Sequence, residues 1–312
     1  MNNAAPIEPY DVSPAMGAGN ASVTPAGSGN VCSQCGSSTG QVANPAPAGW
    51  VYAIGRIVPR FPDLGVEKEF AQAGGGAGAA DGILETNRLI EILKEPQSRY
   101  LARQLCWVFH NGQTETFTLV CRDAAEAERL VEAMPRGESA DQTIQVVVGS
   151  LGYAPADAPC AGAALPAVVI DHHLTFPMSS FIDALAEQGG GDKGSKGNTS
   201  KADEPFRVAA QDLFARLTRR SDNRGMTDEH RALNYVALRY PPLYRLAADS
   251  HRDGKSLVDV QVRRGPGGAR RLVAVRMVFR ARRTDIVERY ECMVDVTDRF
   301  PFLSTSISQV YD

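Results

Sequence analysis

The sequence predicts an α+β fold, with a mixed or antiparallel sheet, hairpins and packed helices, behind a disordered N-terminal tail. From Trp50 onward, strand-like and helix-like runs alternate irregularly, and hairpin turns take the place of the regular crossover helices of a parallel sheet. Residues 1–48 are rich in Gly, Ala, Ser, Asn and Pro and have almost no large apolar side chains. Such a stretch cannot bury enough surface to offset its ordering entropy. We therefore expect one α+β domain over residues 49–312.

The first half of this domain is expected to open with a strand at Trp50. Gly55 within that strand indicates a bulge or a close backbone approach. Asn111-Gly112 between two apolar runs is a strong hairpin signal, and Pro96 is expected to end the helix before it. In chain order we expect a strand over residues 50–58, helices over 66–73 and 81–95, strands over 104–109 and 115–121, a helix over 124–134, and strands over 141–153 and 167–171.

The second half follows a polar, glycine-rich stretch over residues 187–204, which we interpret as a flexible linker or an insertion. Helices are expected over residues 208–217 and 229–238, with Pro241-Pro242 as a break. The chain then finishes with strands over residues 256–262, 271–279 and 287–296. The first of these alternates valine with polar residues, as a half-buried strand does.

The composition argues for a soluble, cytoplasmic protein with reduced cysteines. No apolar run is long enough to span a bilayer, and the N-terminus lacks the basic and apolar regions of a secretory signal. Six cysteines are too few for a disulfide scaffold, and Cys106 and Cys121 lie in apolar runs that favour free buried thiols. With a net charge of −3, nucleic acid is not expected as the main partner, and neither is a membrane.

Cys32 and Cys35 form a Cys-x-x-Cys pair followed by glycine, which is half of a zinc-ribbon knuckle. Two thiolates at this spacing can face one tetrahedral ion, so we expect a structural zinc. A closed site needs four ligands, and no second such pair occurs. Cys160, Cys292, His172 or His173 would have to complete it through the fold, or two chains would share one ion. The alternative is a pair of ordinary thiols in the tail.

Asp171-His172-His173 follows an apolar strand-like run and resembles the triplet of the DHH phosphoesterases, which helps to bind a two-metal centre. Those enzymes also use an Asp-x-Asp pair on an earlier strand, and none occurs upstream here. The alternative is a strand end with satisfied polar side chains. Cys106 and His110 are interpreted as a core cysteine and a turn histidine, and the glycine-rich stretches 74–78 and 189–197 as linkers, since neither matches a phosphate-binding loop. The sequence therefore offers no complete catalytic motif.

The last expected hairpin is dense in arginine, and we take Arg263, Arg264, Arg276 and Arg280 as candidates for binding a peptide or an anion. Arg270, Arg271, Arg282 and Arg283 lie in the same region. The alternative is a solvated outer sheet face, because Arg276 and Arg280 alternate with apolar residues. No aromatic residues interleave with the arginines as RNA-binding surfaces require, so an acidic peptide is the favoured partner.

Several segments together resemble the C-terminal domain of unknown function of the cyanobactin maturation proteases of the PatG and PatA type. These segments are the Cys32–Cys35 pair, the run 51–55 leading into 66–73, the hairpin 105–120, the run 146–151 and the closing stretch 288–302. The resemblance spans about residues 32–312. In that family the domain is appended to subtilisin-like proteases that process ribosomally made, modified peptides. No subtilase motif occurs here, so the resemblance implies a stand-alone accessory protein in such a pathway.

We therefore expect a non-catalytic binding protein that recognises a precursor peptide, or a protease or modifying enzyme encoded nearby. An exposed strand edge would accept an extended peptide, and the arginines would contact its acidic side chains. Two alternatives stay open. One is a metal-dependent peptide-modifying enzyme that uses His172, His173 and the cysteines, and the other is a zinc-stabilised protein that forms homo-oligomers.

The zinc hypothesis makes a direct prediction. Protein purified without chelator should contain about one zinc ion per chain by mass spectrometry, and the Cys32→Ser variant should have lost it, because a structural site does not hold its ion after losing a thiolate. Metal-free wild-type protein would contradict the hypothesis.

Overall fold

The computed structural model describes residues 49–74, 86–135, 142–152, 160, 165–188, 204–218, 223–266 and 268–311. These residues all belong to one compact unit, Pro45–Asp312. The expected tail over residues 1–48, with Cys32 and Cys35, lies outside the described residues, as does most of the expected linker. Within the described part, no helix has both the length and the apolar character to cross a bilayer. The fold is α+β, as the sequence predicts, with one mixed and one antiparallel sheet.

The first sheet closes into a five-stranded barrel with the strand order β1-β2-β3-β5-β4. All its neighbouring strands are antiparallel except β3 and β5, which pair in parallel over three residues. This order, with a helix between β3 and β4, is that of the small Greek-key barrels of the OB type. The strands are β1 (Trp50–Arg60), β2 (Cys106–Asn111), β3 (Thr114–Val120), β4 (Thr143–Gly152) and β5 (Ala167–Pro177).

Large apolar side chains fill the barrel because alternate residues of each strand point inward. Phe109 of β2 stacks on Phe117 of β3 with ring centroids 4.6 Å apart. The same core continues into four short helices, which bury residues such as Phe70 and Leu130 against the barrel. These helices are α1 (Leu64–Ala73), α2 (Thr86–Lys94), the 3-10 helix η1 (Pro96–Arg103) and α3 (Ala124–Glu132).

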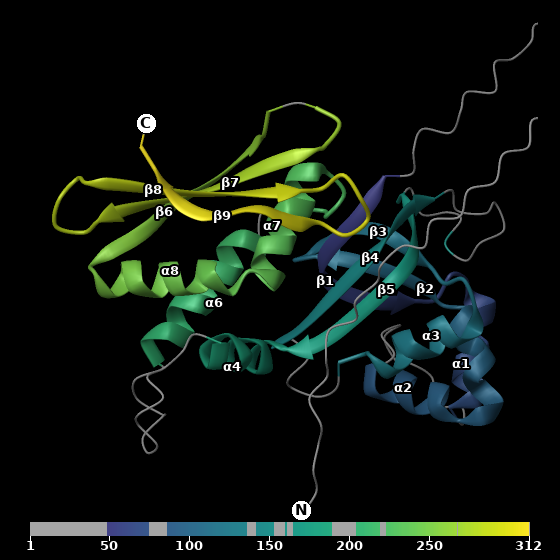
Figure 1. Ribbon diagram of the computed structural model, residues 1–312. Helices are drawn as coiled ribbons and strands as arrows, with labels where there is room; N and C mark the ends of the chain where they lie inside the picture. Colours follow the sequence, from purple (N-terminus) through teal and green to yellow (C-terminus); the bar gives the residue numbers. More distant parts are fainter. Residues whose placement is uncertain are drawn as a thin grey trace, which may run out of the picture. The chain divides into compact units, whose positions relative to one another are not determined.

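A second core joins the outer face of the barrel to the C-terminal half of the chain. Tyr52 and Val146 of the barrel pack in one cluster with apolar side chains from the helices and from the second sheet. That sheet has the order β6-β7-β8-β9, and Figure 1 shows α6, α7 and α8 along one of its faces. The elements are α4 (Met178–Gln188), α6 (Glu204–Thr218), α7 (Asp228–Arg239), α8 (Pro241–Arg252), β6 (Lys255–Arg264), β7 (Leu272–Ala281), β8 (Val287–Asp295) and β9 (Phe302–Val310).

Buried asparagines connect the barrel to the helices. Asn234 of α7 donates from Nδ2 to the Tyr52 carbonyl oxygen at 2.8 Å, and its Oδ1 accepts from Nδ2 of Asn223 at 2.8 Å. Asn111 of β2 donates to the Asn223 carbonyl oxygen, and the Tyr52 amide donates to the Gly225 carbonyl oxygen at 2.9 Å. Gly225 has φ +69°, and a Cβ there would lie 2.5 Å from the Tyr52 oxygen. Only glycine therefore fits this contact.

The expected elements largely coincide with the observed ones. The hairpin turns at Gly112, and Gly55 marks a close approach, since a Cβ there would lie 2.0 Å from the His110 carbonyl oxygen. Three differences stand out. Strand β5 continues through Asp171 to Pro177 where we expected it to end; a fourth strand, β9, follows the expected three; and Pro241 begins a helix, because proline is well placed in a first turn.

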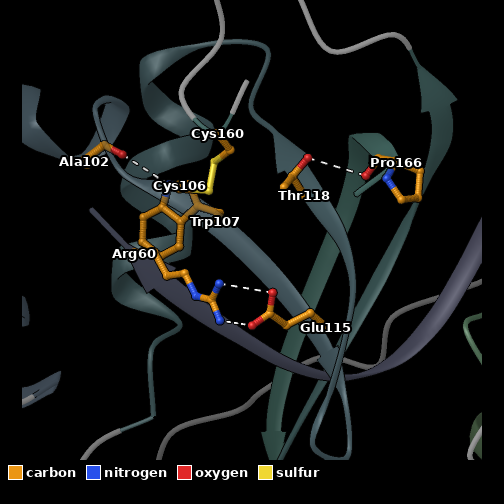
Figure 2. The surroundings of a disulfide bond; sticks show 8 residues. All are labelled: Arg60, Ala102, Cys106, Trp107, Glu115, Thr118, Cys160 and Pro166. Carbon is orange, nitrogen blue, oxygen red and sulfur yellow. Dashed lines mark hydrogen bonds and ion pairs between the residues drawn. A yellow bond between two sulfur atoms is a disulfide. The ribbon is translucent and has the colours of Figure 1, made fainter. Parts of the chain in front are cut away.

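Cys106 forms a disulfide with Cys160, so the prediction of a free buried thiol at Cys106 is wrong. The two Cα atoms lie 5.6 Å apart, within the usual range for a disulfide. The sequence gives no local sign of this pairing, because Cys106 begins β2 and Cys160 precedes β5. The two cysteines are brought together by the strand order, in which β3 lies between β2 and β5. Figure 2 shows the disulfide near the point where Thr118 of β3 donates from its hydroxyl to the Pro166 carbonyl oxygen, 3.4 Å away. Cys121 and Cys292 are free, and burial raises the pKa of each thiol to about 12.

Breaking this disulfide should destabilise the barrel. Because the cross-link joins residues 54 positions apart, reduction or the Cys160→Ser substitution should lower the free energy of unfolding by about 2–4 kcal/mol. Urea unfolding with and without reductant would measure the loss. Reductant should have no further effect on Cys160→Ser, and a second loss of similar size in that variant would contradict the assignment.

Candidate functional site

Three of the four candidate arginines are engaged with neighbouring side chains. Arg264 turns to the helix side of the sheet, where its Nε lies 2.9 Å from Oε1 of Glu229. Arg276 of β7 is opposite Glu291 of β8, and the Arg276 Nε lies 2.9 Å from the Glu291 Oε2. Arg263 donates to Oε1 of Gln261 at 3.0 Å on the outer face of β6. These contacts support the sheet, so the four candidates do not form one patch.

Arg280, the fourth candidate, lies in a hollow of about 350 Å³ beside the β7–β8 turn. Arg282 and Arg283 of the turn line the same hollow, which we call the arginine hollow. Ser256 and Thr284 add hydroxyl groups, and Val258, Ala281 and the carboxylate of Asp285 complete the lining. From the sequence we predicted a binding role for Arg280 but grouped it with Arg263, Arg264 and Arg276. In the structure Arg280 instead shares the hollow with Arg282 and Arg283 of the β7–β8 turn.

The turn that carries the hollow is held by backbone and side-chain hydrogen bonds. Arg282 donates from its amide to the Gly254 carbonyl oxygen and from Nε to the Ser256 hydroxyl, both at 2.9 Å. The Ala281 amide donates to the Ile286 carbonyl oxygen at 3.0 Å. The turn is thus tied to the start of β6. Its arginines therefore occupy a defined position relative to that strand.

The three arginines outnumber Asp285, the one carboxylate of the described lining, so the hollow keeps a net positive charge. No carboxylate of the described chain lies within ion-pair distance of Arg280, Arg282 or Arg283. Glu288 of the adjacent strand is engaged with Lys255, whose Nζ lies 2.7 Å from Oε1, and this hydrogen bond holds the pKa of Glu288 below its ordinary value. The arrangement can therefore bind an anion such as a carboxylate.

The Asp171-His172-His173 triplet lies within β5, and its side chains do not converge. The Asp171 side chain is 2% exposed and forms ion pairs with Arg122 and with Arg299, the latter at 3.3 Å. His172 is exposed and contacts the Phe300 ring. His173 points to the other face, where burial lowers its pKa to about 4 and its Nε2 lies 3.0 Å from the Thr175 hydroxyl. Across the described part of the chain, no three His, Cys, Asp or Glu side chains gather as a metal site would require.

Arg299 owes its position to a buried arginine on α7. Arg231 donates from Nη1 to the Val296 carbonyl oxygen at 2.8 Å and from Nη2 to that of Arg299 at 3.0 Å. The Arg299 guanidinium then lies 5.0 Å from the centre of the Trp50 ring. Burial lowers the pKa of Arg231 to about 10, which leaves it charged at neutral pH. Asp171 therefore serves to hold the β8–β9 turn against the barrel.

Cys106 and His110 do not form a nucleophile and its base. Cys106 is in the disulfide, so it has no free thiol. His110 ends β2 before the hairpin turn, and its pKa is lowered by burial and by the charges of Arg60 and Arg56.

Two comparisons with known proteins support the resemblance that the sequence suggests. Residues 200–311 match the family described as PatG C-terminal. A solved structure titled "PatG Domain of Unknown Function" matches with a TM-score of 0.64 and 17% identity, covering 84% of this chain and 99% of that one. No curated protein matches the sequence. Residues 200–311 are thus similar to the PatG C-terminal family, and at 17% identity the likeness to the solved structure concerns the fold alone.

His173 should make folding pH-dependent. Its pKa is about 4 in the folded protein and 6.5 without burial, so the unfolded chain binds more protons between these values, and stability should fall as the pH falls. The expected loss between pH 7 and pH 4 is about 1–3 kcal/mol, measurable by urea unfolding at each pH. His173→Gln should remove most of the slope that His172→Gln retains; equal slopes in the two variants would contradict this assignment.

Proposed function

We propose that this PatG C-terminal-like domain is a non-catalytic binding protein that recognises an acidic segment of a precursor peptide or of a peptide-modifying enzyme. The observation that carries the proposal is the arginine hollow, in which three guanidinium groups face solvent with no carboxylate partner among the described residues. Guanidinium groups keep their charge at all physiological pH values and bind carboxylates through two parallel hydrogen bonds. A peptide with several carboxylates would therefore match the hollow.

The strand beside the hollow favours an extended peptide. β6 is an edge strand, and Val258 in it is 44% exposed and lines the hollow. The opposite edge, β9, is partly covered, because the amides of Leu303 and Ile307 donate to the hydroxyls of Tyr235 and Tyr240. In β6 the Leu257 carbonyl oxygen accepts from Nη1 of Arg216 at 2.9 Å, and Val260 also has a partner. An extended segment would add to the rest of this edge and bring its acidic side chains to the arginines.

The described structure gives less support to the two alternative functions, a metal-dependent enzyme and a zinc-stabilised oligomer. The candidate catalytic residues His172 and His173 point to opposite faces of β5 and do not converge. His172 contacts the Phe300 ring, and His173 is within hydrogen-bond distance of the Thr175 hydroxyl. A structural zinc or a zinc-dependent oligomer would depend on Cys32 and Cys35, which lie outside the described residues. Neither alternative gains support from a feature of the described fold.

The proposal predicts that binding of an acidic peptide depends on the hollow. Fluorescence anisotropy would measure the Kd of a labelled octapeptide of alternating glutamate and valine. The double variant Arg280→Glu/Arg283→Glu should raise this Kd at least tenfold, because it replaces two attractive contacts by repulsive ones. Raising the salt concentration from 0.05 to 0.3 M should weaken wild-type binding.

A matched control separates contact from net charge. The double variant Lys94→Glu/Arg129→Glu makes the same charge change on exposed positions of α2 and α3. It should leave the Kd within about twofold of the wild-type value. Equal weakening by both double variants would contradict the proposal, as would binding of a single-stranded RNA of the same charge with the same affinity.

A further inference from the structure

A cleft of about 690 Å³ lies where the barrel meets helices α4 and α6. The tip of the β2–β3 hairpin forms one wall, and the first residues of α4 together with one side of α6 form the other. Its volume is within the range of small-ligand sites, which often lie between structural layers.

The floor of the cleft is apolar and its rim is polar. Ile54, Ile144 and Phe214 are buried and supply the floor. The exposed rim side chains include Gln113 of the hairpin and Gln211 of α6, which come from opposite walls. A glutamine amide both donates and accepts hydrogen bonds, so these rim groups match a ligand that carries amide groups of its own.

Arg56 makes one end of the cleft positively charged. It is the one charged side chain among the described residues that line the cleft, and it is exposed at the rim. A guanidinium group has five N–H donors and no acceptor, so it can bind a carboxylate in addition to another partner. Arg56 also has an interaction within the protein.

We propose that this cleft binds a short peptide segment, with apolar side chains on the floor, backbone amides at the glutamine rim and a carboxylate at Arg56. The carboxylate is either that of an acidic side chain or that of a peptide C-terminus. The cleft shares no lining residue with the arginine hollow and is built from the barrel, α4 and α6, whereas the hollow belongs to the second sheet. The inference therefore goes beyond the proposed function and does not depend on it.

Calorimetric titration with three acetylated peptides tests the proposal. The probes are Leu-Phe-Leu with a free C-terminal carboxylate, Leu-Phe-Asp-Leu amide, and the uncharged Leu-Phe-Asn-Leu amide. At least one charged probe should bind the full-length protein tenfold more tightly than the uncharged one, and the tighter of the two identifies the source of the carboxylate. Failure of all three to bind would overturn the proposal, as would equal affinity for all three.

Two variants in the cleft, each with a matched control, locate the binding. Gln211→Trp should abolish it by filling the cleft from an exposed helical position, whereas Val208→Trp, exposed on α6 and outside the lining, should not change it. Arg56→Gln should lower the affinity for the charged probe at least tenfold, and Arg60→Gln on the same strand should leave it within about twofold. Arg280→Glu/Arg283→Glu should also leave it unchanged; loss of binding only in that variant would move the site to the hollow and overturn the proposal.

Discussion

The buried asparagine network between the barrel and α7 is the constraint on which the rest of the structure depends. Asn223 and Asn234 are each 1% exposed. The Asn234 side chain donates to the Tyr52 carbonyl oxygen of β1, and the Asn111 side chain of β2 donates to the Asn223 carbonyl oxygen. A buried polar group that loses its partner costs about 1–3 kcal/mol, so the network strongly favours one placement of α7 against β1. An apolar contact of the same area would be less directional. Asn223 also donates from Nδ2 to the Leu217 carbonyl oxygen of α6 at 3.4 Å, so the network reaches a helix that forms part of one wall of the cleft.

A second set of polar contacts fixes the β8–β9 turn against the barrel. Arg231 holds the turn through its carbonyl oxygens, and Arg299 in the turn reaches Asp171 and Trp50. Asp171 thus lies between two arginines from opposite halves of the described fold, Arg122 and Arg299. Taking a carboxylate out of water is costly, and ion pairs such as these offset part of that cost. Asp171, which the sequence analysis considered as part of a metal site, instead links the barrel to the β8–β9 turn through its ion pairs.

Local signals in the sequence predicted most of the elements but little of their assembly. The Asn111-Gly112 turn and the apolar runs beside it were sufficient for the first hairpin, because both strands and their turn are contiguous. The closure of the barrel depends on the pairing of β3 with β5, and the disulfide on Cys160 reaching Cys106; neither has a local signal. The arginines were visible as a group, but which of them are engaged depends on cross-strand partners such as Glu291 and on helix residues such as Glu229. The cleft was missed because its walls come from segments far apart in the chain.

The short parallel seam between β3 and β5 has a consequence for how the protein reaches its native state. Strands far apart in the sequence must meet before the barrel can close, and contacts of this kind form late and slowly. The cysteine pair spans the same seam, so its sulfur atoms are held within bonding distance once β2, β3 and the start of β5 are assembled. During folding, the rate at which the two thiols become protected from alkylation therefore reports the rate of barrel closure.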